Sequence, residues 1–384
     1  MRICLDARGN YFGGVYTYTH SLLRNLSEVD SELEYLILLD QHQVDEGRLL
    51  VASLEHRTIP VMSPLKMVWW NNTALSELLK REKIDLYHGL KHFGLRYPPK
   101  TQCKMIWTLH SASWWVFPEL FSLRERLFWT RYYQWGARRL DHVICVSHAD
   151  KKTFVEATGL TADKVSVTQL AANERFQQVT DSNELTLVRK RYQLPEQYVL
   201  FVGTIYPFKN IETILDLFAR AMRKKGFPHH LVLAGDVSPA YGDTYQHKLN
   251  DQAEKLGITN KVHWLGSIFD DLPAIYTLAD ILVFPSFFEA FPQPPLEAMA
   301  CGTPVVASDV AGLVEVIGDA GLLRGPQDIG GLTNDVVRVL DDEHVRTELI
   351  RKGFERAQHF SWERCTQNTV RVYREVLGLS DVSH

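Results

Sequence analysis

Apolar, strand-like runs alternate with helix-like runs along the whole chain, and the alternation is interrupted only once. The first series of expected strands comprises Ile3–Ala7, Glu34–Leu39, Asp85–His88, Met105–Leu109 and Val143–Val146, with helices at Tyr16–Leu26 and Leu75–Lys83. The second series comprises strands at Tyr198–Val202, His230–Ala234, Val262–Trp264, Ile281–Phe284 and Val305–Ala307, with helices at 211–224, 245–256 and Leu296–Ala300. Strands separated by helices form parallel sheets. The pattern therefore predicts an α/β protein with two Rossmann-like domains.

A chain of 384 residues is long enough to build two domains with separate hydrophobic cores. The polar stretch 172–196 interrupts the alternation, and we expect the interdomain linker there. This gives an N-terminal domain over residues 1–175 and a C-terminal domain over residues 190–360, followed by an amphipathic helix at Trp362–Leu377. Two such domains facing across a cleft would bind ligands at the carboxyl ends of their strands.

The composition is that of a globular protein, with 45% hydrophobic and 23% charged residues. A net charge of −4 gives no indication of a nucleic-acid partner. No run approaches the roughly 20 apolar residues that span a bilayer. The 5 cysteines are scattered, without the C-x2-C spacing of a zinc site, and fit buried thiols in a reducing compartment. We therefore expect a cytoplasmic protein.

Two glutamates, Glu289 and Glu297, lie on either side of a proline-rich turn and just ahead of a short helix. One carboxylate is expected on the loop and the other in the first helical turn, so that both can face one site. Free N–H groups at a helix N-terminus bind phosphate. A carboxylate beside them can accept hydrogen bonds from two hydroxyls, as on a ribose. The arrangement suits a sugar nucleotide.

The extended motif, Glu-x7-Glu followed by Ala-Met-Ala-x-Gly-Thr-Pro-Val-Val, resembles the donor-site signature of the retaining glycosyltransferases of family 4, which have the GT-B fold. The resemblance implies that Glu289 contacts hydroxyls of the donor sugar and that Glu297 binds the ribose. It also implies that residues 362–384 pack back on the N-terminal domain. The other substrate-binding residues expected around the sugar are Phe291, Pro292, Gln293 and Leu296. Pro292 departs from the family pattern, because it cannot donate a backbone hydrogen bond to the sugar, and Gln293 is expected to compensate.

A second motif, Gly203 to Asn210, joins an expected strand to an expected helix. Gly203 allows close approach of the backbone, Asn210 is a good N-cap, and Lys209 places a cation beside the positive end of the helix, which suits a bound anion. By resemblance, Lys209 contacts the donor diphosphate. Thr204 is also expected at the substrate, although it and Phe208 stand where family members usually carry arginine, so that one phosphate-binding cation is missing.

Five further site residues come from the resemblance. Gly235 and the pair Ser267 and Ile268 follow expected strands and match the family's nucleotide-binding edges, with the backbone near Ser267 and Ile268 bonded to the base. Gly14 lies in a loop that would reach the donor diphosphate from the other domain. His110, at the end of an expected strand, would lie beside the donor sugar. Glu289, Lys209 and His110 are therefore the expected catalytic residues.

Aromatic residues and arginines are concentrated in residues 107–139, with more aromatic residues at 67–70. Two interpretations stay open: a buried helix with a solvated arginine face, or an acceptor groove or membrane-surface patch for a lipid-linked glycan. The aromatic residues of the longer stretch are Trp107, Trp114, Trp115, Phe117, Phe121, Phe128, Trp129, Tyr132, Tyr133 and Trp135.

By resemblance, the chain is expected to be a retaining hexosyltransferase of polysaccharide biosynthesis. Besides the cytoplasmic location expected from the cysteines, one of the two interpretations of the aromatic stretch adds peripheral contact with the inner membrane face. The enzyme would move a hexose, best taken as glucose from UDP-glucose, to a glycan or lipid-linked glycan, with no metal ion and no cofactor besides the donor. Two alternatives stay open. One is a UDP-sugar 2-epimerase on the same fold, and the other is a non-catalytic protein that binds sugar nucleotides.

Overall fold

The structure is a computed structural model and describes residues 1–9, 13–45, 54–63, 66, 69–71, 73–91, 103–118, 123–223, 226–239 and 241–380. The chain forms two compact units. The first comprises Met1–Leu170 together with Ser361–His384, and the second comprises Ala171–Phe360. None of the helices in these described ranges is long and apolar enough to cross a membrane.

The described strands of the first unit form a seven-stranded parallel sheet in the order β3-β2-β1-β4-β5-β6-β7. Its strands are β1 Arg2–Asp6, β2 Glu34–Asp40, β3 Glu55–Ile59, β4 Leu86–Gly89, β5 Lys104–Leu109, β6 His142–Cys145 and β7 Val165–Val167. Its helices are α1 Gly13–Val29, α2 Gln41–Asp45, α4 Ala74–Arg81, α5 Ser113–Val116, α6 Leu123–Ala137, α7 His148–Thr158 and α16 Trp362–Leu377. The central strands are buried on both faces, as parallel strands covered by helices are.

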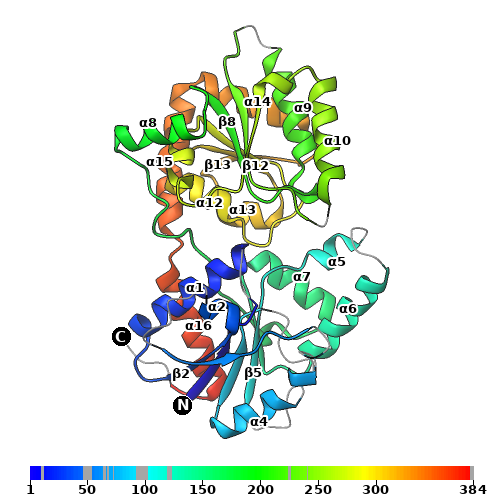
Figure 1. Cartoon of the computed structure of the whole chain (residues 1–384), viewed down its shortest axis with the longest axis vertical. Helices are drawn as coiled ribbons and strands as arrows, with labels where there is room; N and C mark the ends of the chain where they lie inside the picture. The colour runs from blue at the N-terminus through cyan, green and yellow to red at the C-terminus, as the bar shows by residue number, and fades with distance from the viewer. Residues whose placement is uncertain are drawn as a thin grey trace. The chain divides into compact units, whose positions relative to one another are not determined.

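Helix α16 belongs to the first unit although it ends the described sequence, and it packs beside α1 (Figure 1). Arg374 of α16 donates to Asp30 at 3.1 Å and to Glu32 at 2.6 Å. Inside the unit, the Tyr373 hydroxyl lies 2.6 Å from Nδ1 of His88, a residue of β4. Burial, with a smaller effect of the neighbouring His110, lowers the pKa of His88 to about 3, so this histidine is neutral.

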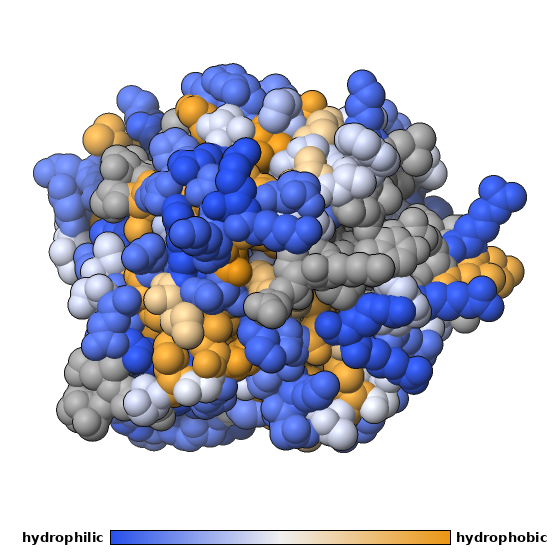
Figure 2. All heavy atoms as spheres, turned by 90° about the horizontal axis from the view of Figure 1, so that it is seen from below, coloured by the Kyte–Doolittle hydropathy of each residue, from blue (hydrophilic) through white to orange (hydrophobic). Residues whose placement is uncertain are grey.

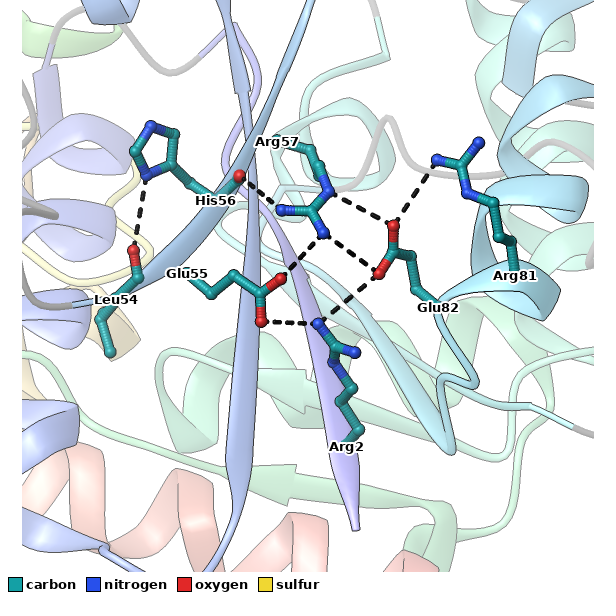
Figure 3. A network of polar contacts seen from close by, with 7 residues as sticks. All are labelled: Arg2, Leu54, Glu55, His56, Arg57, Arg81 and Glu82. Carbon is teal, nitrogen blue, oxygen red and sulfur yellow. Dashed lines mark hydrogen bonds and ion pairs between the residues drawn. The ribbon is translucent and has the colours of Figure 1, made fainter.

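A cluster of charged residues joins the amino ends of β1 and β3 to the end of α4 (Figure 3). Glu55 pairs with Arg2 at 2.6 Å and with Arg57 at 2.8 Å, and Glu82 lies 3.3 Å from Arg57 and 3.6 Å from Arg2. Ligands of parallel sheets bind at the opposite, carboxyl ends of the strands. We therefore assign this cluster a structural role.

The described strands of the second unit form a six-stranded parallel sheet in the order β10-β9-β8-β11-β12-β13. Its strands are β8 Tyr198–Val202, β9 His230–Ala234, β10 Val262–Gly266, β11 Ile281–Phe284, β12 Val305–Ser308 and β13 Gly321–Arg324. Its helices are α8 Ser182–Arg191, α9 Ile211–Met222, α10 Gly242–Lys255, α11 Leu272–Leu278, α12 Gln293–Ala300, α13 Ala311–Ile317, α14 Ile329–Asp341 and α15 Glu343–Gln358. Two Rossmann-like units with parallel sheets confirm the predicted fold class.

The stretch expected to be the linker, residues 172–196, contains helix α8 of the second unit. The carboxylate of Asp181 caps this helix by accepting a hydrogen bond from the backbone N–H of Asn183. One apolar residue of α8, Val188, is buried. The chain passes from the first unit to the second at Leu170–Ala171, ahead of the expected linker. A polar helix with little buried surface is difficult to tell from a linker by hydrophobic pattern alone.

Candidate active site

Three glycines lie together at the carboxyl ends of β8, β9 and β10. A Cβ atom on Gly235 would lie 2.0 Å from the carbonyl oxygen of Gly203, so only glycine allows this close approach. The backbone N–H of Gly235 also donates to the carbonyl of Gly266 at 2.8 Å. The predicted site residues Gly203 and Gly235 are therefore neighbours, and Thr204 follows them with an exposed side chain.

Asp236 fixes the predicted base-binding segment to the end of β9. Its carboxylate accepts hydrogen bonds from the backbone N–H of Ser267 at 3.2 Å and from the Ser267 hydroxyl at 2.5 Å. Ser267 is exposed and Ile268 is half-buried. The two residues thus lie at the same edge of the sheet as the glycines. Asp236 was not singled out from the sequence, although an acidic residue directly after a strand-end glycine is a usable signal.

Lys209 and Glu289, 80 positions apart in the sequence, form a buried ion pair with Nζ and Oε1 separated by 2.6 Å. Their side chains are only 10% and 11% exposed, so water screens the pair weakly. Burial by itself lowers the pKa of Lys209, but the charge of Glu289, the interaction with Tyr206 and the hydrogen bond to Glu289 outweigh it and leave the pKa raised. The lysine is a full cation at neutral pH, held against the carboxylate.

Asn210 does not act as the N-cap that the sequence indicated, because its side chain makes no capping hydrogen bond to α9. Its amide nitrogen instead donates to the carbonyl oxygens of Pro285 at 3.0 Å and Pro326 at 2.9 Å. The capping prediction was therefore wrong. Helix α9 still begins directly after this residue, at Ile211.

Glu297 lies in α12, which begins at Gln293, three residues earlier than expected. One Glu297 oxygen accepts a hydrogen bond from the Tyr276 hydroxyl at 3.0 Å. Burial raises the pKa of Glu297 to about 7, although this hydrogen bond and the charge of Arg175 both lower it. The carboxyl group is therefore close to half-ionised at neutral pH in the ligand-free protein.

The other residues predicted around the sugar differ in exposure. Leu296 is fully buried in the core, and Phe291 is 8% exposed with its ring edge-on to Phe360. Any contact of Leu296 with a substrate therefore involves its backbone. Gln293 is half-buried and donates to the carbonyl of Ala171 at 3.3 Å, so part of its hydrogen-bonding capacity is already used. Pro292 precedes α12 and is buried.

The raised pKa of Glu297 predicts a pH-dependent stability of the ligand-free protein. Its native pKa of about 7 lies above the ordinary 4.5, so the native state keeps a proton that the unfolded state loses between these values. The free energy of unfolding should therefore fall as the pH rises through this window and level off above it. In Glu297→Gln this contribution should vanish. Between pH 5 and pH 8 the free energy of unfolding of the variant should therefore fall by about 2 kcal/mol less than that of wild type.

Denaturant unfolding of both proteins at pH 5 and pH 8 measures the effect. The control is Glu196→Gln, which changes a carboxylate that is 90% exposed and should follow the wild-type pH dependence. Equal pH dependence of wild type and Glu297→Gln would show that Glu297 ionises normally.

His110 and Gly14 belong to the first unit, whereas the other predicted site residues belong to the second. The Nε2–H of His110 donates to the carbonyl of Leu90 at 2.8 Å, which leaves Nδ1 as an acceptor. Burial lowers the pKa of His110 to about 4, with the backbone of Leu90 opposing the shift and Lys91 adding to it. Gly14 is an exposed residue in the first turn of α1. Action of these two residues on the donor stays a prediction.

The aromatic stretch divides between core and surface. Trp107 is buried, and Trp114 and Trp115 pack against the core of the first unit. Leu123 and Leu127 of α6, by contrast, are 72% and 55% exposed. Met67, Val68, Phe121 and the side chains of Arg126, Phe128, Trp129, Tyr132 and Tyr133 lie outside the described part of the chain. The stretch thus supplies part of the core of the first unit and, on α6, exposed apolar side chains, and contact of the stretch with an acceptor or a membrane stays a prediction.

Comparison with known families decides the class of protein. Residues 12–172 match the family "Glycosyltransferase Family 4", and residues 187–356 match the family "Glycosyl transferases group 1". The O-antigen chain mannosyltransferase B of Escherichia coli is 30% identical over 346 residues, which are 87% of this chain and 85% of that protein. The chain belongs to glycosyltransferase family 4. It is therefore a glycosyltransferase, as the sequence motifs indicated.

Solved structures confirm the GT-B fold of this family 4 member. A glycosyltransferase from Rickettsia africae superposes with a TM-score of 0.77 at 17% identity, over 99% of both chains. Anabaena HepE, crystallised with UDP and glucose, superposes with a TM-score of 0.75 at 19% identity, over 98% of this chain and 100% of HepE. At these identities the likeness concerns the fold alone.

Proposed function

We propose that this family 4 protein is a retaining hexosyltransferase that moves mannose from a nucleoside diphosphate mannose to a glycan or lipid-linked glycan in polysaccharide assembly. The observation that carries the proposal is the buried Lys209–Glu289 pair, which offers a cation and a carboxylate together beside the glycine-lined ends of the sheet. Mannose replaces the glucose expected from the motifs, because the Escherichia coli relative that matches most of this chain is a mannosyltransferase.

In the proposed reaction the bond between the sugar C1 and the diphosphate oxygen breaks, and a bond from C1 to an acceptor hydroxyl oxygen forms on the same face. The acceptor proton passes to the departing diphosphate oxygen. Lys209 stabilises the negative charge that develops on the diphosphate, which is electrostatic catalysis of the kind that a buried cation performs well. Glu289 contacts the sugar hydroxyls and stabilises positive charge at C1. Glu297 accepts hydrogen bonds from the ribose.

We propose further that the reaction needs no metal ion. The residues that the structure describes contain no group of three His, Cys, Asp or Glu side chains arranged to hold one. Activity measured with EDTA and with added Mg²⁺ tests this point directly. Equal rates under both conditions support the proposal, and a requirement for the cation contradicts it.

A donor panel tests the proposed substrate. Thermal unfolding with GDP-mannose, UDP-glucose and UDP-GlcNAc shows which donor binds, because a ligand of the native state raises the melting temperature. Sugar transfer to mannose-terminated oligosaccharides and the anomeric configuration of the product then test the reaction. Binding without transfer or hydrolysis favours the non-catalytic alternative, which the exposed Thr204 in place of an arginine supports. Consumption of UDP-GlcNAc without any acceptor favours the epimerase.

Membrane contact of the first unit is a separate part of the proposal. Hydrophobic residues reach the surface in several patches (Figure 2), so exposed leucines alone do not indicate membrane contact. On α6, however, Leu123 and Leu127 lie one helical turn apart, and the exposed Arg124 and Arg131 lie on the same helix. Apolar side chains beside arginines suit the surface of an anionic membrane.

We expect the protein to sediment with phosphatidylglycerol vesicles at low salt and to bind phosphatidylcholine vesicles much more weakly. The double variant Leu123→Asp/Leu127→Asp should lose most of this binding, because each apolar side chain is replaced by an anion. Leu187→Asp, which changes a leucine that is 61% exposed in the second unit, is the control. Unchanged sedimentation of the double variant would exclude α6 as the contact.

A further inference from the structure

Asn210 has a backbone conformation that few residues other than glycine adopt. Its φ of 58° and ψ of 45° lie in the left-handed helical region, where asparagine is among the best tolerated of the other residues. The side chain is 3% exposed. A buried residue is kept in an unfavourable conformation only when its surroundings fix it, and such residues are concentrated at functional sites.

The contacts of Asn210 explain why the side chain is an amide. Its single nitrogen donates one N–H to the carbonyl of Pro285, directly after β11, and the other to the carbonyl of Pro326, in the loop after β13. Aspartate has the same shape but no such donors, and glycine adopts the same backbone but has no side chain. Asparagine alone combines this length, this conformation and two donors on one atom.

The hydrogen bond to Pro285 connects the turn that carries Lys209 to the loop that carries Glu289, and the bond to Pro326 ties the same turn to the loop after β13. Lys209 directly precedes Asn210, and Pro285 begins the segment that leads to Glu289. The backbone N–H of Phe287 adds a bond to the carbonyl of Phe208 at 2.8 Å. The two loops are thus joined at both ends of the Pro285–Phe287 segment.

We infer that Asn210 is a positioning residue, which holds Lys209 against Glu289 through its bonds to the carbonyls of Pro285 and Pro326. The inference deepens the proposed function, on which its catalytic consequence rests. A residue needed only to begin α9 would affect stability and leave the ion pair unchanged. A positioning residue would change the pair itself, and with it the turnover rate.

The test compares Asn210→Gly and Asn210→Asp with wild type. Asn210→Gly keeps access to the left-handed backbone and removes both hydrogen bonds, whereas Asn210→Asp places a carboxylate against two carbonyl oxygens. The first measurement is the rate at which acetic anhydride modifies Lys209, followed by mass spectrometry. A weaker pair leaves more of the amine unprotonated, and each unit by which its pKa falls raises the reactive fraction about tenfold. We expect at least that increase in both variants.

The second measurement is steady-state kinetics with the donor that the panel identifies. We expect kcat to fall about a hundredfold, the loss that a displacement of about 1 Å can cause, with a much smaller change in the donor KM. The control is Gln193→Gly, at an exposed position of the same unit that also has a left-handed conformation, with φ of 50°. This control should leave both measurements unchanged.

Each outcome decides the question. Modification rates like those of the control in both variants would overturn the inference, and so would failure of both variants to fold, because the amide would then support the unit as a whole. The modification of Lys209 needs no donor, so this test of Asn210 remains valid even if no transferase reaction is found. Faster modification without any detectable transfer would support the role of Asn210 and count against the proposed function.

Discussion

Glu289→Gln should lower kcat by about two to three orders of magnitude, while the donor KM changes little. Glutamine keeps the size of the side chain but removes the negative charge that stabilises positive charge at the sugar C1, and losses of this size are usual when one electrostatic contact is removed. The change also leaves Lys209 buried without its anion. We therefore expect a loss of about 3 kcal/mol in the free energy of unfolding of the ligand-free protein. Steady-state kinetics and denaturant unfolding measure the two effects.

A matched control for Glu289→Gln is Glu212→Gln. Glu212 pairs with Lys248 at 2.8 Å in the same unit, but the lysine side chain is 63% exposed. Pairs of this exposed kind contribute little to stability. The control should therefore keep nearly wild-type kinetics. A Glu289→Gln protein with wild-type kcat would remove this carboxylate from the active site.

Gly312→Ala should nearly abolish turnover, although Gly312 bears no functional group. A Cβ atom at this position would lie 2.0 Å from the carbonyl oxygen of Glu289 and 3.1 Å from that of Ala290. Both are backbone atoms that cannot rotate away, so the loop that carries Glu289 must move. We expect kcat to fall about a hundredfold or more and stability to fall by about 1–3 kcal/mol.

The control for this glycine is Gly330→Ala in α14. There the added Cβ would meet its nearest atom, in Asp328, at 3.8 Å, which is an ordinary contact. Because alanine favours a helix over glycine, this variant should gain up to about 1 kcal/mol in stability and keep full activity. Equal kinetics of the two alanine variants would mean that the Glu289 loop accommodates the added Cβ atom at position 312 without loss of activity.

The sequence predicts the central strands of both sheets well, since Tyr198–Val202 and Ile281–Phe284 are short, fully apolar runs of the kind that parallel sheets bury. Peripheral strands were missed. The edge strand Glu55–Ile59 is mostly polar, and Val165–Val167 is only three residues long. Such strands exist because the neighbouring strand offers free hydrogen-bonding groups, which a linear pattern does not reveal.

The candidate site shows the same division. Gly203 and Gly235 could be proposed because they follow apolar strands, and Glu289 because it begins the Glu-x7-Glu motif. The pairing of Glu289 with Lys209 could not be predicted from the sequence. The two residues are 80 positions apart and meet only because β8 and β11 are neighbours in the sheet. The error at Asn210 has a similar cause. Its amide bonds to the carbonyls of Pro285 and Pro326, both distant in sequence, rather than to the helix beside it.

The position of α16 has a consequence for how the chain is made. A ribosome releases residues in order, so the first unit must wait for this helix until the whole of Ala171–Phe360 has been synthesised. Until then Asp30 and His88 lack the partners that Arg374 and Tyr373 supply. The usual order, in which the N-terminal domain of a nascent protein folds first, should therefore be reversed here. The unit that emerges second is the one that can complete its fold first.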